Sequence, residues 1–188
     1  MSYKLINVTS IEMLNRVYNF RYQIMYTELN IVFANDEELE YDKYDKYSDH
    51  FAILDEKDNI CASMRLIHNS PIGYPTEEYL ELSEDIKIYN RKKLGELSRI
   101  FIHSNKRNFK DSKIILNKMM KELAYDKIKE YGIDYVYGSV EAAFLRLINM
   151  CKIPYVSIGD SKVYNGANRY PVILYTKALE FQNPQLLK

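Results

Sequence analysis

Arginines stand inside segments that otherwise favour a buried core, and this conflict limits what the chain can fold into. Arg21 lies along the apolar stripe of a predicted helix, one turn after Val17. Arg65 and Arg99 lie within segments that favour β-strands. An unpaired buried charge is costly, so a stable fold must bring acidic groups to these three side chains.

The acidic groups are concentrated in residues 33–49, a segment with neither helical nor strand periodicity. A loop of this length in a small domain is more often functional or mobile than idle. Asp42 and Asp45 are the obvious counter-charges. We expect one ion network that joins both carboxylates to Arg21 and Arg99 and folds the loop over the sheet. The alternative is a network that only pins the loop and has no role in function.

Composition indicates one ordinary globular domain. The 188 residues are 47% hydrophobic and 28% charged, and 26 basic side chains balance 26 acidic ones, so we expect no nucleic-acid partner. No apolar run approaches the ~18–20 residues that cross a bilayer, and residues 1–10 lack a signal-peptide layout, so we expect a cytoplasmic protein without an integral membrane segment. Neither the two cysteines nor the three histidines show metal-ligand spacing, so we expect no metal.

Periodicity and breakers predict one mixed α/β domain over 1–188, with an antiparallel core and a parallel crossing near its middle. No internal repeat or linker divides it. The predicted strands are 3–8, 50–54, 60–68, 95–103, 133–140, 153–158 and 170–176. The predicted helices are 11–29, 76–82, 111–131 and 141–151.

The segment Glu96-Leu97-Ser98-Arg99 is the most informative motif. The period of two in a strand predicts Glu96 and Ser98 on one face, with Leu97 and Arg99 on the other. A carboxylate inside a central strand needs either a partner or a chemical role.

These motifs together resemble a known superfamily. Their order along the chain is Arg21, then Glu40-x-Asp42-x-x-Asp45, then Arg65, then Glu96-x-Ser98-Arg99. The chain resembles the GNAT acyltransferases, and within them the autoinducer (acyl-homoserine-lactone) synthases and the N-acyl amino acid synthases. Residues 157–159 and 164–171 look more like the N-acyl amino acid synthases and the exosortase-associated acyltransferases. The resemblance implies a mostly antiparallel, twisted sheet that is flanked by helices and splayed between its central strands.

The same resemblance implies roles for side chains. Glu96 would take a proton from an attacking amine, directly or through water. Ser98 would bind the acceptor or the thiolate, unless it is only a small residue in a tight strand. The charged side chains implied in substrate binding are Arg21, Asp42, Asp45, Arg65, Arg99 and Arg169. For Arg169 the alternative is that it only caps a turn. An acyl pocket is implied at residues that equally suit an ordinary core: Phe101, Met119, Phe144, Leu147 and Ile148.

Two departures from the family pattern concern the substrates. Autoinducer synthases carry an aromatic side chain, usually Trp, after the first helix where S-adenosylmethionine binds, and here only Phe33 or Tyr26 can replace it. The glycine-rich coenzyme A loop is also missing. Residues 104–113 instead carry cations that suit an acidic acyl carrier protein, and Arg-Lys-Lys at 91–93 precedes the same strand. The residues implied in binding the carrier are Lys106, Arg107 and Lys110. The alternative is that these cations are only solvent-exposed loop residues.

We therefore expect an N-acyltransferase that moves a fatty acyl group to the amine of an amino acid or a similar small molecule. The co-substrate is the thioester of an acyl carrier protein or coenzyme A, and no permanently bound cofactor is expected. One alternative is acyl-homoserine-lactone synthesis from S-adenosylmethionine. Another is a non-catalytic acyl-binding module. The sequence leaves open the acyl length, the acceptor, the type of donor and the oligomeric state.

Overall fold

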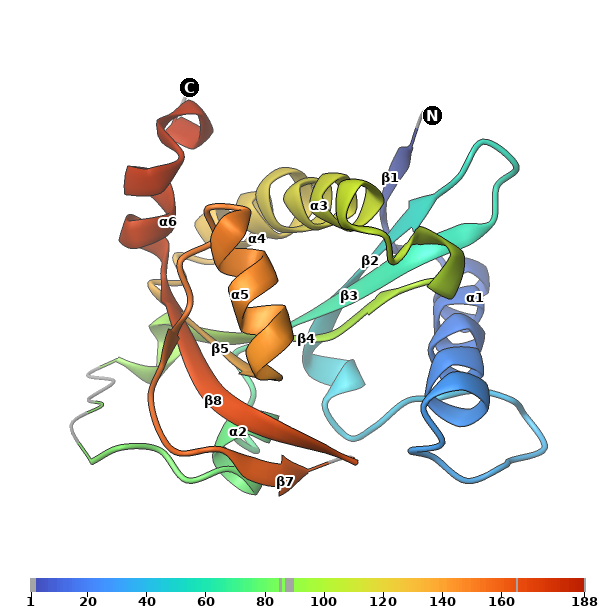
Figure 1. Ribbon diagram of the computed structural model, residues 1–188, viewed down its shortest axis with the longest axis horizontal. Coiled ribbons are helices and arrows are strands. Elements are labelled where there is room, and N and C mark those ends of the chain that lie inside the picture. The colour runs from blue at the N-terminus through green and yellow to red at the C-terminus, as the bar shows by residue number, and fades with distance from the viewer. Residues whose placement is uncertain (1–2, 85, 87–89, 165, 188) are drawn as a thin grey trace.

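An eight-stranded open sheet runs through the computed structural model, which describes residues 3–84, 86, 90–164 and 166–187 (Figure 1). The strand order is β1-β2-β3-β4-β5-β8-β6, and β7 pairs with β8. Only β4 and β5 run parallel. The strands are β1 (Lys4–Asn7), β2 (Ser48–Leu54), β3 (Ile60–His68), β4 (Leu94–Ile102), β5 (Tyr135–Val140), β6 (Val156–Ser157), β7 (Lys162–Tyr164) and β8 (Ala167–Tyr175).

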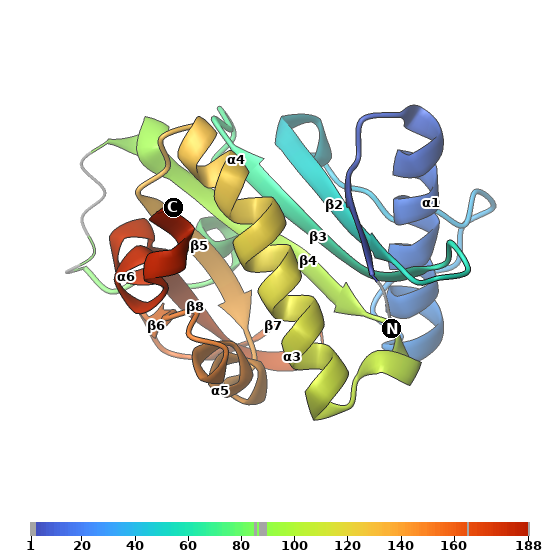
Figure 2. The same cartoon turned by 90° about the horizontal axis from the view of Figure 1, so that it is seen from above.

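Helices cover both faces of this sheet (Figures 1 and 2). One face carries α3, α4 and α5, whereas α1, the acidic loop and α2 lie against the other. Two helices contain a π-helical turn: Gln23–Glu28 continues α1, and Met119–Ala124 joins α3 to α4. The helices are α1 (Ile11–Tyr22), α2 (Pro75–Tyr79), α3 (Phe109–Lys118), α4 (Tyr125–Glu130), α5 (Ala142–Met150) and α6 (Thr176–Gln182). Within the described residues, we find no helix that is both long and apolar enough to span a bilayer.

Alternation along the strands sorts the core into two clusters. Met64, Leu66 and Leu97 point to the face under α3 and α5, where the larger cluster lies. Ile67 and Tyr137 point to the opposite face and belong to the smaller cluster under the acidic loop. Each fully buried apolar side chain of this kind stabilises the fold by ~1.5–3 kcal/mol.

The central strands separate partway along their length. β4 and β5 pair only through Leu94–Tyr135, Gly95–Val136 and Glu96–Tyr137. Beyond Glu96 the two strands continue without pairing, to Ile102 and Val140. The splay that the family resemblance implies is therefore confirmed, and Glu96 stands where it begins.

A β-bulge overturns one prediction about β4. Arg65 pairs with Ser98, but Ser63 pairs with Phe101, so β4 contains one extra residue opposite β3. Arg99 takes up that residue with a left-handed backbone, φ +51°. Its side chain consequently reaches the same face as Ser98, whereas strict alternation predicts the opposite face. The alternation fails because the extra residue resets it.

Several element boundaries differ from those predicted. The C-terminal strand begins earlier, and it forms a hairpin with β7, which the sequence does not predict; Gly166 at the turn has φ +71°. Helix α6 is also missing from the prediction. The acidic loop is shorter than expected, because a 3₁₀ turn at Asp45–Tyr47 and β2 take up its last residues. Helix α3 begins at Phe109 rather than near residue 111, since Asn108 provides the cap.

Candidate active site

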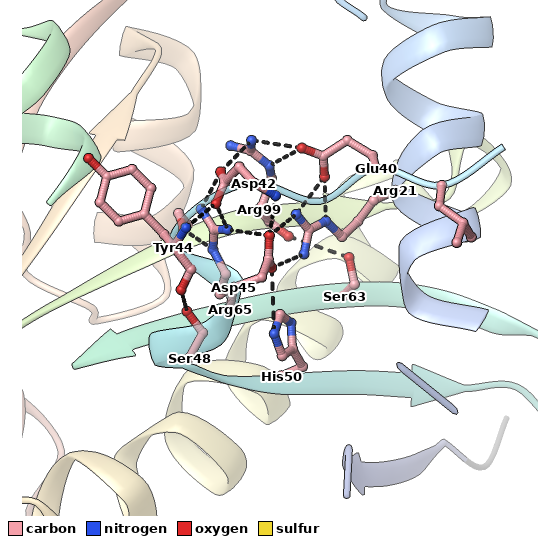
Figure 3. Close-up of polar contacts among 12 residues, drawn as sticks. Arg21, Glu40, Asp42, Tyr44, Asp45, Ser48, His50, Ser63, Arg65 and Arg99 are labelled. Atoms are coloured by element: carbon pink, nitrogen blue, oxygen red, sulfur yellow. Dashed lines mark hydrogen bonds and ion pairs between the residues drawn. The ribbon is translucent and has the colours of Figure 1, made fainter. Parts of the chain in front are cut away.

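Three arginines and three carboxylates form a closed ring between α1, the acidic loop and the sheet (Figure 3). In order around this ring they are Arg21, Glu40, Arg99, Asp42, Arg65 and Asp45. The closest contacts between ring neighbours measure 2.5–3.0 Å. Positive and negative charges alternate, so every guanidinium is neutralised by two carboxylates. This is the ion network expected from the sequence, enlarged by Arg65 and Glu40.

The ring is built from separate parts of the chain that the fold brings together. Helix α1 supplies Arg21, β3 supplies Arg65 and the bulge in β4 supplies Arg99. The acidic loop supplies all three carboxylates. Glu40 belongs to the same sequence motif as the aspartates, but no role was predicted for it. Its spacing of two and five residues from Asp42 and Asp45 is the signal that could have indicated one.

Burial and ion pairing together determine the charge state of the ring. Arg21 and Arg65 are only 1% and 0% exposed, and their guanidinium groups are occupied by ring carboxylates. Burial alone would raise the pKa of Glu40, but Arg99 and Arg21 hold that pKa below its ordinary value. The pKa of Asp45 is lowered in the same way, because Arg21 and Arg65 outweigh its burial. Both carboxylates therefore stay charged at neutral pH.

His50 lies beside the ring without adding to its charge. Its Nε2 is 3.5 Å from Oδ1 of Asp45. Burial lowers the pKa of His50 to about 4, although Asp45 acts in the opposite direction. The imidazole is therefore neutral at physiological pH, and the ring keeps three charges of each sign.

Glu96 occupies the point where β4 and β5 separate. The side chain is 1% exposed, and its Oε2 accepts a hydrogen bond of 2.9 Å from the backbone N–H of Thr76 in α2. Burial raises the pKa of Glu96 to about 7, although the Thr76 N–H and Arg65 both favour the charged form. A carboxyl group with this pKa can take up and release a proton at physiological pH.

A cavity of about 440 Å³ opens beside Glu96 and extends into the splay between β4 and β5. Its polar wall includes Ser98, Arg99 and Arg169. Of the predicted acyl-pocket residues, three line the cavity: Phe101, Phe144 and Leu147. The other two, Met119 and Ile148, are not lining residues.

Met119 and Ile148 lie in the core rather than on the wall of this cavity, where the acyl pocket was expected. Both side chains are buried in the larger core cluster, where the π-helical turn and α5 face the sheet. Their apolar character serves packing between helix and sheet. The sequence cannot separate a pocket wall from the core behind it, because both require the same side chains.

Ser98 and Arg169 each form a hydrogen bond within the fold and also line the cavity. Oγ of Ser98 accepts a hydrogen bond of 3.0 Å from Nε of Arg65, and the residue also lines the cavity. Nε of Arg169 donates to the carbonyl oxygen of Tyr164 at 3.1 Å, which braces the β7–β8 hairpin. The nearest carboxylate to Arg169, that of Glu141, lies 3.6 Å away.

The predicted carrier-binding cations occupy different positions. Arg107 lines the cavity, donates to the carbonyl oxygen of Ile102 at 2.7 Å and contacts Glu28 at 2.5 Å, which ties the β4–α3 loop to the π-helical turn of α1. Lys110 is exposed and Lys106 is half-buried. The second basic run, Arg91–Lys93, precedes β4 and so lies at the strand's other end.

The first turn of α3 is already capped by the chain itself. Oδ1 of Asn108 accepts from the N–H of Asp111 at 2.9 Å, and Nδ2 of Asn108 donates to the Asp111 carboxylate at 2.9 Å. A carboxylate at this position disfavours a bound phosphate. Across the described ranges, we also find no group of three or more His, Cys, Asp and Glu side chains suited to a metal ion.

The open, mostly antiparallel sheet, splayed between β4 and β5 and flanked by helices, has the fold expected of GNAT acyltransferases. The family profile described as "Acetyltransferase (GNAT) domain" matches residues 20–116, just over half of the chain. The chain therefore belongs to this family, and it is an acyltransferase. The predicted superfamily, fold class and enzyme class are confirmed, and the non-catalytic module is set aside. A comparison with curated protein sequences finds no match.

Solved structures share the fold over nearly the whole chain. TofI, in a ternary complex with an inhibitor and MTA, has a TM-score of 0.77 at 17% identity and covers 99% of this chain and 100% of its own. BjaI, a CoA-dependent acyl-homoserine lactone synthase solved with SAM and isopentyl-CoA, has a TM-score of 0.77 at 15% identity and covers 98% of this chain and 90% of its own. FeeM, an N-acyl amino acid synthase from uncultured soil microbes, has a TM-score of 0.69 at 12% identity and covers 99% of this chain and 97% of its own.

Proposed function

We propose that this protein transfers a fatty acyl group from the thioester of an acyl carrier protein to the amine of an amino acid. The observation that carries the proposal is the position of Glu96. It is a buried carboxyl group with a pKa of about 7, on the wall of the cavity where β4 and β5 separate. A group with this proton affinity suits the removal of a proton from an ammonium group at physiological pH.

The chemistry we assign to the site needs no acyl group bound covalently to the enzyme. Glu96 accepts a proton from the ammonium group of the acceptor, and the free amine then attacks the thioester carbonyl. A backbone N–H of β4 beyond Glu96, where β5 no longer pairs with the strand, donates to the oxyanion of the tetrahedral intermediate. The attack forms the C–N bond, and the C–S bond then breaks. The departing thiolate takes the second proton of the amine, and Glu96 releases the first to solvent.

Arg169 is our candidate for holding the carboxylate of the acceptor. Arg99 also lines the cavity, but it is engaged by Glu40 and Asp42 at 2.8 and 3.0 Å. Nε of Arg169 is bonded to the carbonyl oxygen of Tyr164, and the one carboxylate near its guanidinium among the described residues, that of Glu141, lies 3.6 Å from Nη2. A guanidinium group in such a position can still form a charge-assisted bond with a ligand.

The remaining ring members receive a different role from the one the resemblance implied. Arg21 and Arg65 are buried and occupied by carboxylates, so they have no free edge for a substrate. We assign to them, with Asp42 and Asp45, the positioning of Arg99 beside the cavity. Ser98 then offers its hydroxyl group to the acceptor or to the thiolate.

The donor is proposed to be an acyl carrier protein because the loop before α3 is poorly suited to coenzyme A. Residues 104–113 contain no glycine, and Asp111 occupies the first turn of α3. Lys106 and Lys110 offer positive charge for an acidic carrier, and Arg107 lies at the cavity itself. The acyl chain would lie along Phe101, Phe144 and Leu147.

Acyl-homoserine-lactone synthesis is the second candidate, since BjaI, solved with SAM, shares the fold with a TM-score of 0.77. The aromatic side chains available for that substrate argue against it. Phe33 is 93% exposed, and Tyr26 stacks on Tyr22 with ring centres 5.1 Å apart. The cavity is lined instead by Met25, Leu29 and Ile31 from this part of the chain.

Mass analysis of products tests the proposal directly. The purified protein is given a fatty acyl thioester on an acyl carrier protein or on coenzyme A, together with either a mixture of amino acids or S-adenosylmethionine. We expect an N-acyl amino acid from the carrier-bound donor, and its loss in Glu96→Gln. A lactone product would establish the second candidate. An equal rate from coenzyme A would contradict the choice of donor.

A further inference from the structure

Helix α2 is the element that touches Glu96 from outside the sheet. Thr76 is fully buried, and its N–H makes the 2.9 Å bond to the Glu96 carboxylate. Pro75, one residue earlier, lines the cavity. A helix of five residues has little stability of its own, so its contacts with the rest of the fold must hold it in this position.

Glu78 supplies one such contact. Its Oε1 accepts a hydrogen bond of 2.8 Å from Nζ of Lys43, and its Oε2 accepts one from the hydroxyl group of Tyr44. Tyr44 is 2% exposed, and its N–H donates to Oδ1 of Asp42 at 2.8 Å. A continuous series of bonds thus connects the charged ring with α2, and α2 with Glu96.

We propose that Glu78 is a positioning residue, which through Tyr44 and Lys43 holds α2 so that the Thr76 N–H stays on the Glu96 carboxylate. The consequence for activity rests on the function proposed above, in which Glu96 is the base. The bond from Thr76 favours the ionised form of Glu96, so weakening that bond makes the carboxylate harder to form. Glu78 therefore influences proton transfer without touching either substrate.

The direction in which the pKa of Glu96 changes distinguishes the loss of positioning from the loss of the negative charge of Glu78. The titratable and charged groups that act on Glu96 are Arg65 on β3, Glu77 on α2, Tyr137 on β5, and the buried Tyr44, Tyr74 and Tyr155. Removing the negative charge of Glu78 would, by Coulomb interaction alone, lower the pKa of Glu96. Loss of positioning raises it. Tyr44→Phe changes no charge at neutral pH, so it isolates the positioning effect.

The chain contains a matched control. Glu180 on α6 also accepts a bond from a tyrosine and one from a lysine, with Oε1 2.9 Å from the hydroxyl group of Tyr125 and 2.7 Å from Nζ of Lys129. Neither these residues nor α6 line the cavity. Glu180→Ala and Tyr125→Phe therefore remove the same kinds of bond at a distance from Glu96.

The experiment measures the pKa of the Glu96 carboxyl group by carbon-13 NMR, with its signal assigned by its loss in Glu96→Gln. We expect Glu78→Ala and Tyr44→Phe each to raise that pKa by ~0.5–1 unit. Combining Glu78→Ala with Tyr44→Phe should raise the pKa of Glu96 no further than Glu78→Ala alone. The low-pH limb of kcat/KM should move by the same amount, with the high-pH plateau within about twofold of wild type. Both control variants should leave the pKa and the pH profile unchanged.

An unchanged or lowered pKa in Tyr44→Phe would overturn the positioning role, and so would an equal shift in the control variants. Tyr44→Phe removes a single hydroxyl group, so it gives an answer even if Glu78→Ala folds poorly. Failure of the proposed function is separately visible. If Glu96→Gln keeps full turnover, Glu96 is not the base, whereas a raised pKa of Glu96 in Tyr44→Phe would still establish that Tyr44 and Glu78 position α2.

Discussion

Arg65 and Arg99 share one carboxylate oxygen. Oδ2 of Asp42 lies 3.1 Å from Nη2 of Arg65 and 3.0 Å from Nη2 of Arg99. Two guanidinium groups, one buried and one half-buried, repel each other at this separation, and the carboxylate between them offsets that repulsion. Each acid in the ring bridges two arginines, so the loss of any one acid leaves both of them with one carboxylate instead of two.

The first prediction concerns the stability of the ring. Asp45→Asn should lower the free energy of unfolding by ~3–5 kcal/mol, because it leaves Arg21 and Arg65 buried with too little negative charge. Urea-induced unfolding measures this loss. Asp58→Asn breaks the exposed pair with Arg16 and is the control, with an expected loss below ~1 kcal/mol. Similar losses in both variants would mean that the ring contributes no more than a surface pair.

The second prediction concerns turnover. Glu96→Gln keeps the shape of the side chain but cannot accept a proton, so kcat should fall by ~10²–10⁴-fold at pH 8 while the circular dichroism spectrum is unchanged. In the wild type, kcat/KM should decrease as pH falls through about 7, where Glu96 becomes protonated. Glu122→Gln alters a half-exposed carboxylate paired with Lys118 and should retain full activity. Wild-type turnover in Glu96→Gln would exclude Glu96 from the mechanism.

The third prediction links the pKa of Glu96 to stability. Below about 4.5 the carboxyl group is protonated in the folded and the unfolded chain, so it has no effect on pH dependence. Between about 4.5 and about 7 only the unfolded chain loses the proton, and stability falls as pH rises. Above about pH 7 the raised pKa lowers the free energy of unfolding by a constant amount, a penalty of about 3 kcal/mol.

Glu96→Gln removes this penalty. Its free energy of unfolding relative to wild type should therefore increase between pH 4.5 and pH 7 and then level off. Denaturant unfolding of both proteins across this pH range gives the difference, in which contributions from other titrating groups cancel. A difference that is independent of pH would show that Glu96 has an ordinary pKa.

Much of this fold could be predicted from the sequence because its patterns are local. Strand β3 has its predicted bounds, and β2, β4 and β5 lie within one or two residues of theirs. Polar turns and apolar runs mark these strands clearly. The pairing of buried arginines with the acidic loop could also be predicted, since an unpaired charge inside the sheet is costly.

The remaining features depend on contacts between distant segments. The side of the sheet that Arg99 occupies is set by a bulge opposite Ser63 and Arg65, and no local pattern indicates the extra residue. The anchoring of α2 depends on Glu78 meeting Tyr44, which is 34 residues away. Met119 and Ile148 have the character of pocket walls but face the core, and only packing decides between the two positions.

The fourth prediction concerns the acceptor. Arg169→Gln should raise KM for an amino acid by ~10–100-fold, because a charge-assisted bond to its carboxylate is lost. The KM for the acyl donor should remain within about twofold. Steady-state kinetics with the amino acid and with its decarboxylated amine provide the comparison. If both acceptors lose affinity equally, Arg169 only braces the β7–β8 hairpin through Tyr164.

The fifth prediction concerns the acyl carrier. Lys106→Glu with Lys110→Glu should raise KM for the carrier-bound donor by ~10-fold or more, because like charges slow the encounter with an acidic partner. A small uncharged thioester should react almost as before. Salt should raise the wild-type KM for the carrier, since the Debye length is only ~10 Å at 0.1 M, and the double variant should lose that dependence.

Lys92→Glu is the matched control for this surface. Lys92 is exposed in the other basic run, which the nine residues of β4 separate from Lys106 by roughly 30 Å. The control should leave both donors unaffected. Arg107→Ala should instead impair both donors, because Arg107 lines the cavity and contacts Glu28. If Lys92→Glu alone raised KM for the carrier, the partner would dock at the other end of β4. If neither lysine variant had an effect, the basic loop would be ordinary solvated surface.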